Sequence, residues 1–163
     1  MKAVTLLALF TFALTCHAGE MNKPAPAFEL PHLDDAQTIT SLDSTNGKIR
    51  YLDFWASWCA PCRVSVPAII QLQADLGGDD FDVIAVNVDE NPDAARRFLR
   101  RYDINYTVLS DPDASSAADY KLPGMPTSYV LDRDGVIKLV HSGFKPGDMD
   151  KIRETITALL EQE

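Results

Sequence analysis

Apolar and polar residues follow one another along the chain in blocks that predict interleaved strands and helices. Block 49–55 is aliphatic and aromatic on both faces, as in a central strand buried on both sides. From residue 61 to 76 apolar residues fall on one helical face, and Gly77-Gly78 ends that helix. Further strands are predicted at 28–30, 38–40, 81–88, 106–109, 127–131 and 136–140, and further helices at 92–102, at 114–120 and from 148 onward. This order indicates one α/β domain with a central mixed β-sheet flanked by helices and preceded by a small hairpin.

The first residues predict an export signal rather than part of the fold. Lys2 precedes a short apolar run, 3–14, and small residues precede a cut after Ala18. The run is shorter than the roughly 20 residues that a membrane span needs. We therefore predict a signal peptide at 1–18 and a periplasmic domain at 19–163. Lipid attachment at Cys16 is the alternative, but threonine directly before that cysteine fits a lipoprotein signal poorly.

The charge balance restricts the partners. The chain has 15 Lys and Arg against 24 Asp and Glu, a formal net charge of −9. Nucleic-acid binding depends on a basic field, so this balance argues against it. A chain of 163 residues suits one compact domain, which we expect to be a monomer.

Cys59 and Cys62 are the candidate redox pair. They come directly after the strongest predicted strand and open a helix. Unsatisfied N–H groups and the positive end of the helix dipole favour a thiolate there, so Cys59 is the candidate nucleophile. Cys62 is close enough to resolve a mixed disulfide. Pro61 is compatible with a first helical turn, since no donor is needed there.

Other roles for the two cysteines are less consistent with the sequence. A zinc site needs about four ligands, and His32 and His141 are isolated, so no metal is predicted. A four-residue ring also constrains the unfolded chain too little to serve as a structural staple.

Two segments resemble the thioredoxin superfamily. Residues 53–63, Asp-Phe-Trp-Ala-Ser-Trp-Cys-Ala-Pro-Cys-Arg, look like its active-site segment, and 124–127, Gly-Met-Pro-Thr, look like its cis-proline loop. The longer segment between them and the exported N-terminus resemble the TlpA/ResA-like branch. The resemblance implies a thioredoxin-like fold with an extra strand and helix before the cis-proline half.

The resemblance also implies a function. It implies a thiol-disulfide oxidoreductase without a dissociable cofactor, which exchanges disulfides with exported proteins and receives electrons from a membrane thiol carrier. Pro126 would be cis, and Met125 and Trp58 would contact the substrate chain. Because Ala60-Pro61 holds no group that stabilises the thiolate unusually, we expect the reducing direction.

Two positions depart from that branch. Ser65 stands where the branch often has glutamate, which weakens a role in cytochrome c maturation. Asp53 is the residue that thioredoxin has, at a position where the branch often has asparagine, while Ala85 replaces thioredoxin's lysine. Asp53 either faces solvent or is buried with a raised pKa, and a buried acid of this kind is suited to moving the Cys62 proton.

Two rival functions and one surface feature remain open. A peroxidase would use a lone cysteine in a Pro/Thr-rich pocket, and a metallochaperone would hold Cu(I) on the two thiolates. The predicted helix 92–102 carries four arginines on one face, Arg96, Arg97, Arg100 and Arg101, opposite its apolar residues. They are either a solvated face or a docking surface for an acidic partner.

Overall fold

The computed structural model describes residues 19–42 and 47–162. The predicted signal peptide and Cys16 therefore lie outside the described residues. The chain forms β1 (Glu29–Pro31), β2 (Ile39–Ser41), β3 (Ile49–Trp55), α1 (Cys62–Leu76), β4 (Phe81–Asn87), α2 (Pro92–Leu99), β5 (Thr107–Ser110), α3 (Ser115–Asp119), β6 (Thr127–Leu131), β7 (Ile137–Ser142) and α4 (Asp148–Leu160).

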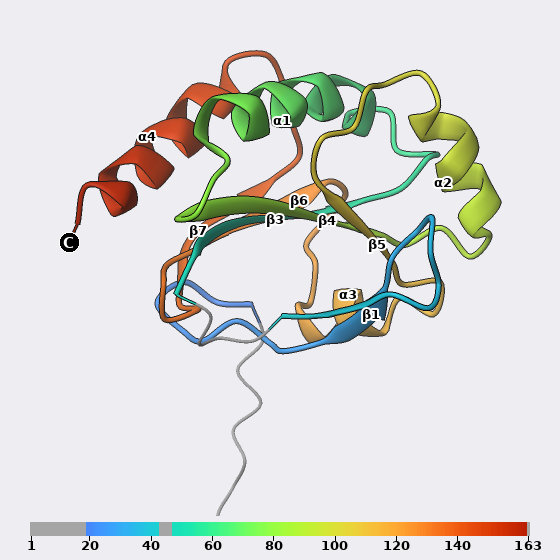
Figure 1. Cartoon of the computed structure of the whole chain (residues 1–163), viewed down its shortest axis with the longest axis horizontal. Coiled ribbons are helices and arrows are strands. Elements are labelled where there is room, and N and C mark those ends of the chain that lie inside the picture. Colours follow the sequence, from blue (N-terminus) through green and yellow to red (C-terminus); the bar gives the residue numbers. More distant parts are fainter. Residues whose placement is uncertain (1–18, 43–46, 163) are drawn as a thin grey trace, which may run out of the picture.

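Five strands form the central sheet, in the order β5-β4-β3-β6-β7. β3 is parallel to β4, and β4 to β5, while β6 and β7 run antiparallel to their neighbours. Helices α1 and α4 cover one face of this sheet, and the β1–β2 hairpin and α3 lie on the other (Figure 1). The predicted mixed sheet with an N-terminal hairpin is confirmed, and so is a strand with a helix, β5 and α3, before the Pro126 loop.

Strand β3 is buried along its whole length, as its apolar sequence predicts. Leu52 and Phe54 pack into the cluster shared with the β1–β2 hairpin and α3. Ile49 and Tyr51 pack on the opposite face, in the cluster that contains residues of α1 and α4. Because residues of one strand alternate between faces, Asp53 points to the helix side together with Tyr51.

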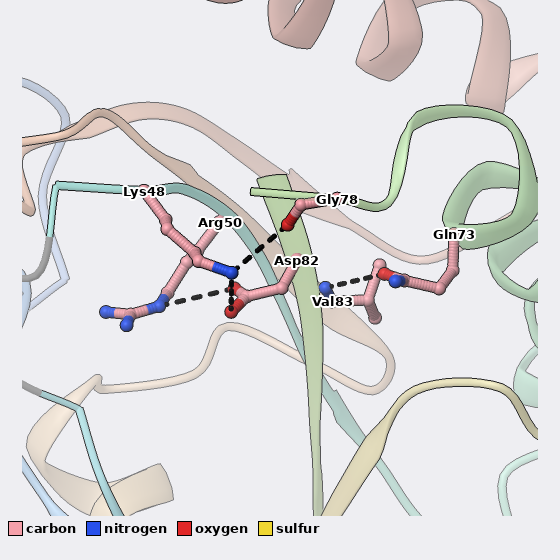
Figure 2. A network of polar contacts seen from close by, with 6 residues as sticks. All are labelled: Lys48, Arg50, Gln73, Gly78, Asp82 and Val83. Atoms are coloured by element: carbon pink, nitrogen blue, oxygen red, sulfur yellow. Dashed lines mark hydrogen bonds and ion pairs between the residues drawn. The ribbon is translucent and has the colours of Figure 1, made fainter. Parts of the chain in front are cut away.

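A polar network fixes the start of β3 against the start of β4 (Figure 2). The Arg50 side chain is buried and its Nε lies 3.3 Å from Asp82, the residue opposite it in the register. The Lys48 ammonium lies 4.0 Å from the same carboxylate and donates to the Gly78 carbonyl at 3.1 Å. Since β3 and β4 are parallel, this fixed register also sets their carboxyl ends side by side, where the two cysteines follow.

β5 is shorter than β4, so the start of β4 has no strand neighbour on the β5 side. The pairing of β4 with β5 starts at Ile84, and the Val83 N–H just before it donates instead to Gln73 Oε1 of α1, at 2.9 Å (Figure 2).

The helix after Pro92 was predicted to reach residue 102 but ends at Leu99. After Leu99 the chain makes a tighter turn, in which the Tyr102 N–H donates to the Leu99 carbonyl three residues back. None of the helices in the described part of the chain is both long and apolar enough to span a membrane.

Candidate active site

The turn between β3 and α1 carries the two cysteines. Cys59 and Cys62 form a disulfide, with their Cα atoms 5.4 Å apart. The turn begins with a bond from the Cys59 N–H to the Ala56 carbonyl at 3.1 Å. Pro61 is the N-cap of α1, with helical dihedral angles (φ −63°, ψ −26°), so the helix starts at the second cysteine. The sequence therefore places one cysteine just before a helix and the other at its first position.

The sulfur of Cys59 faces the N-terminus of α1. The Cys62 N–H points at Cys59 Sγ, with 3.3 Å between nitrogen and sulfur. The first turn of α1 contains no acidic residue and has no side-chain cap, so no carboxylate competes for the Cys62 N–H. This N–H and the positive end of the helix dipole stabilise negative charge on the Cys59 sulfur once the disulfide is opened. Cys59 is 4% exposed and Cys62 fully buried.

Asp53 is buried on the face of the sheet that packs against the residue cluster containing the disulfide. Its side chain is 2% exposed, and its partners on the neighbouring strands are Ala85 and Ser128. Ala85 belongs to the cluster that contains both cysteines, so Asp53 lies next to that cluster. Burial raises the pKa of Asp53 well above its ordinary value. Of the two readings of Asp53, the structure therefore supports the buried acid.

The loop at Pro126 packs, through Met125, on the cluster that contains the disulfide. The Met125–Pro126 peptide bond is cis. The Thr127 hydroxyl donates to the Gly124 carbonyl at 2.8 Å, and the Gly143 N–H donates to the Pro126 carbonyl at 2.8 Å, so the loop is held on both sides. Met125 is half-buried and packs on the cluster of the cysteines. The sequence motifs at 53–63 and 124–127 are thus brought together in space.

Apolar surface remains open beside the disulfide. Trp58, which directly precedes Cys59, is 66% exposed, and Val64 in the first turn of α1 is 44% exposed. A large exposed aromatic next to a reactive group is typical of a contact site. Ser65, by contrast, is fully buried and donates to the Cys62 carbonyl at 3.3 Å, so this position places no acid near the pair.

Asp89 is a site residue that the sequence did not single out. Its carboxylate is 4% exposed and accepts from the Ser57 N–H at 2.9 Å, the Ser57 hydroxyl at 2.8 Å and the Asn87 side-chain amide at 2.7 Å. The Asn87 side-chain oxygen Oδ1 in turn accepts from the Asp89 N–H at 3.1 Å. Ser57 lies two residues before Cys59, so Asp89 holds the turn that carries the nucleophile. A polar Asn-x-Asp at the carboxyl end of a buried parallel strand was the available signal.

His32 and His141 lie apart from this site. His32 forms a bridge with Leu109 of β5, whereas His141 belongs to β7, so they lie at opposite edges of the sheet. Each has its own partner: His32 Nε2 lies 2.8 Å from the Thr40 hydroxyl, and His141 Nε2 lies 3.1 Å from Asp148.

The site combines a cysteine pair at a helix N-terminus with a buried acid and a cis-proline loop, both next to the cluster that contains the pair. This combination defines a thioredoxin-like thiol-disulfide oxidoreductase. Comparison with known proteins agrees: a family model described as Redoxin matches residues 20–158. The chain therefore belongs to the Redoxin family.

Individual relatives have the same activity in their names. The thiol:disulfide interchange protein HelX of Rhodobacter capsulatus is 37% identical over 139 residues, which are 85% of this chain and 76% of HelX. DsbE of Allochromatium vinosum is 31% identical, over 86% of this chain and 75% of DsbE. A crystal structure described as a DsbE of Chlorobium tepidum has a TM-score of 0.80 at 39% identity and covers 86% of this chain and 98% of its own.

Proposed function

We propose that this oxidoreductase reduces disulfides of exported proteins, with Cys59 as nucleophile, Cys62 as resolving cysteine and Asp53 as the proton acceptor of Cys62. The observation that supports it most is the Cys62 N–H pointing at the Cys59 sulfur, with an acid of raised pKa buried next to the cluster that contains both cysteines.

In the first step the Cys59 thiolate attacks one sulfur of the substrate disulfide. A bond forms between Cys59 and that sulfur, the substrate S–S bond breaks, and the other substrate sulfur leaves as a thiolate that takes up a proton. In the second step Cys62 gives its proton to Asp53 in its ionised form, and the Cys62 thiolate attacks the Cys59 sulfur. The Cys59–Cys62 disulfide forms, the S–S bond between Cys59 and the substrate breaks, and the second substrate sulfur leaves as a thiolate that takes up the proton released by Asp53. The substrate gains two electrons and two protons, and a membrane thiol carrier is the expected source of electrons for the next cycle.

Substrate contacts follow from what surrounds the pair. Trp58 offers an exposed ring, and the Met125 backbone precedes the cis proline at the disulfide, where an extended substrate segment would pair with it. These contacts do not identify a particular partner protein. The apolar surface and the backbone would bind an extended chain around a disulfide, whatever its sequence.

The reducing direction is tested by the reduction potential. Ala60 and Pro61 provide no charge to stabilise the reduced state, so the potential should lie nearer that of thioredoxin, about −270 mV, than the strongly oxidising end near −120 mV. The protein of residues 19–163 is equilibrated with glutathione of defined redox ratio, and the reduced fraction is read from intact mass after alkylation. A protein that stays mostly reduced even in oxidising mixtures would be an oxidant and would overturn the direction.

A second measurement addresses the Cu(I) alternative. The reduced protein is titrated with Cu(I) and, in parallel, assayed for reduction of a peptide disulfide. Disulfide reduction by the native protein, lost in Cys59→Ser, supports the proposal. Tight copper binding with no disulfide reduction would favour a metallochaperone.

A further inference from the structure

A row of polar side chains crosses the face of the sheet that α1 and α4 cover. In the strand register Asp53 of β3 lies opposite Ser128 of β6, and Ser128 lies opposite His141 of β7, the edge strand. Residues opposite one another on neighbouring strands point to the same face, so the three side chains share one side of the sheet. We call these three residues the polar row. It leads from the acid next to the cysteine cluster to the edge of the sheet.

The neighbouring row on the same face serves packing alone. Two residues away along each strand, Tyr51, Val130 and Leu139 lie opposite one another and belong to the cluster that contains residues of α1 and α4. A polar side chain in such a place costs free energy unless it is bonded, and three in succession on three strands are not required by the fold. The polar row therefore indicates a role other than packing.

Exposure increases along the polar row toward the edge of the sheet. Asp53 and Ser128 are each 2% exposed, whereas the His141 side chain is 23% exposed. In an antiparallel pair the Cβ atoms of opposite residues are about 4.5–5.5 Å apart, so neighbouring members of the row can bond directly or through one water. The row thus joins an enclosed carboxyl group to a histidine that reaches solvent.

His141 is held in place by the start of α4, which covers this face (Figure 1). Its Nε2 lies 3.1 Å from Oδ2 of Asp148, and the same oxygen accepts from the Lys145 N–H at 2.9 Å. The Phe144 ring packs edge-on against the imidazole, with 6.4 Å between the ring centroids. Because an imidazole has two nitrogens, the ring can bind Asp148 with one and exchange a proton with the other.

Two tyrosines also face Asp53, Tyr51 from its own strand and Tyr106 from the segment before β5. Burial raises the pKa of both hydroxyls far above the ordinary value, and the charge of Asp53 adds to this effect. Neither tyrosine therefore becomes a phenolate that could take the proton of Asp53. Tyr51 is fully buried, but Tyr106 lines a cavity of about 750 Å³ and is the one rival path to solvent that we consider.

We propose that Ser128 and His141 form a proton route between Asp53 and solvent. This inference rests on the proposed function, in which Asp53 takes the proton of Cys62, and adds how the buried acid becomes ionised again. The Asp53 carboxylic acid gives its proton to the Ser128 oxygen while the Ser128 O–H gives its own to His141, which releases that proton to solvent. One proton leaves Asp53 and one enters the solvent, from which the substrate thiolate takes one up, so serine and histidine are unchanged.

The test is the rate at which the mixed disulfide is resolved after rapid mixing with a peptide disulfide, measured from pH 6 to 9. His141→Gln keeps a donor for Asp148 but cannot carry a proton, and Ser128→Ala removes the hydroxyl. Each should slow resolution about fivefold at pH 7. The double variant should be no slower than either single one, because both changes interrupt the same route. The loss should shrink toward pH 9, where more of Asp53 is ionised before the turnover begins.

Controls separate a proton route from a structural role. His32→Gln removes the histidine at the opposite edge of the sheet and should leave the rate unchanged. Ser128→Thr keeps a hydroxyl and should lose less than Ser128→Ala. Imidazole added at constant pH and ionic strength should accelerate His141→Ala several-fold and the native protein little, since a small base can replace a missing proton carrier but not a missing contact.

The remaining outcomes contradict the inference in different ways. Native rates in both His141→Gln and Ser128→Ala, with Asp53→Asn still slow, would overturn the route and leave the proposed function intact. Slow resolution in Tyr106→Phe but not in His141→Gln would place the exit at the cavity instead. Slowing that imidazole does not relieve would mean that the row only positions Asp53. Native resolution in Asp53→Asn would remove the proposed role of Asp53 and the route together.

Discussion

Asp53 places a carboxyl group inside a fully buried strand, and this makes stability depend on pH. Its raised pKa means that, above the unfolded-state value of about 3.9, the unfolded chain releases a proton that the folded protein keeps. The free energy of unfolding therefore falls as pH rises from about 4 toward the raised pKa. Asp53→Asn keeps size and polarity without the ionisation, so we expect it to be more stable at pH 7, on the order of 1–3 kcal/mol. Denaturant unfolding at pH 4 and 7 checks this, and the advantage of the variant should shrink at pH 4.

The same substitution should slow catalysis at the second step. Without a proton acceptor, Cys62 must release its proton unaided, which we expect to slow resolution of the mixed disulfide by about 10²-fold near pH 7. Attack by Cys59 should change little. Rapid-mixing kinetics from pH 6 to 9 separates the two steps. An Asp53→Asn protein with native resolution kinetics would exclude Asp53 from proton transfer.

Ser57 provides a test of how Asp89 holds the active-site turn. Ser57→Ala removes the hydroxyl bond to Asp89, and Ser115→Ala removes an equivalent bond to the buried carboxylate of Asp111, at the start of α3. Each should cost about 1–2 kcal/mol of stability, since each leaves a carboxylate oxygen short of a donor. Only Ser57→Ala should also lower kcat/KM for disulfide reduction, about three- to tenfold, because only that bond positions Cys59. Equal rates in the two variants would limit Asp89 to a structural role.

At the level of the elements, the junction of β3 and α1 assigns different roles to the two cysteines. Cys59 precedes the helix and faces its N-terminus, while Cys62 is fully buried inside its first turn. Cys62→Ser should therefore accumulate mixed disulfides through Cys59, and Cys59→Ser should trap few. Non-reducing electrophoresis and mass spectrometry of the trapped species measure this. Equal trapping by both variants would refute the assignment.

The elements also show which parts of the molecule the sequence can predict. β3, α1 and the two active-site motifs follow from local apolar patterns, turn residues and proline positions, and the structure confirms those elements. The end of α2 at Leu99 was missed, because the tighter turn after it depends on tertiary packing rather than on helix propensity. Asp89 was missed for a similar reason: its partner Ser57 is 32 residues away, and only the parallel pairing of β3 with β4 brings them together.

At the level of the whole molecule, a charged network and the redox site lie at opposite ends of the same strands. The polar network of Lys48, Arg50 and Asp82 fixes the strand starts, and the redox pair sits at the opposite, carboxyl end of the same strands. The residues that fix the strand register and the residues that react thus lie at opposite ends of β3.

The final prediction concerns export, on which the proposed substrates depend. Expressed from residue 1 in a bacterial host with a periplasm, the protein should be recovered from the periplasm with an intact mass that starts at Gly19. Ala18→Leu should block processing, since the residue before the cut must be small. Cys16→Ser keeps a small residue at the −3 position and removes the only possible lipid site of the signal, so it should leave location and mass of the mature protein unchanged. A mass that retains residues 1–18, or a membrane-bound protein with lipid on Cys16 that Cys16→Ser releases, would contradict the prediction. Lipidation would leave the redox chemistry in place but would confine it to disulfides that can reach the membrane surface.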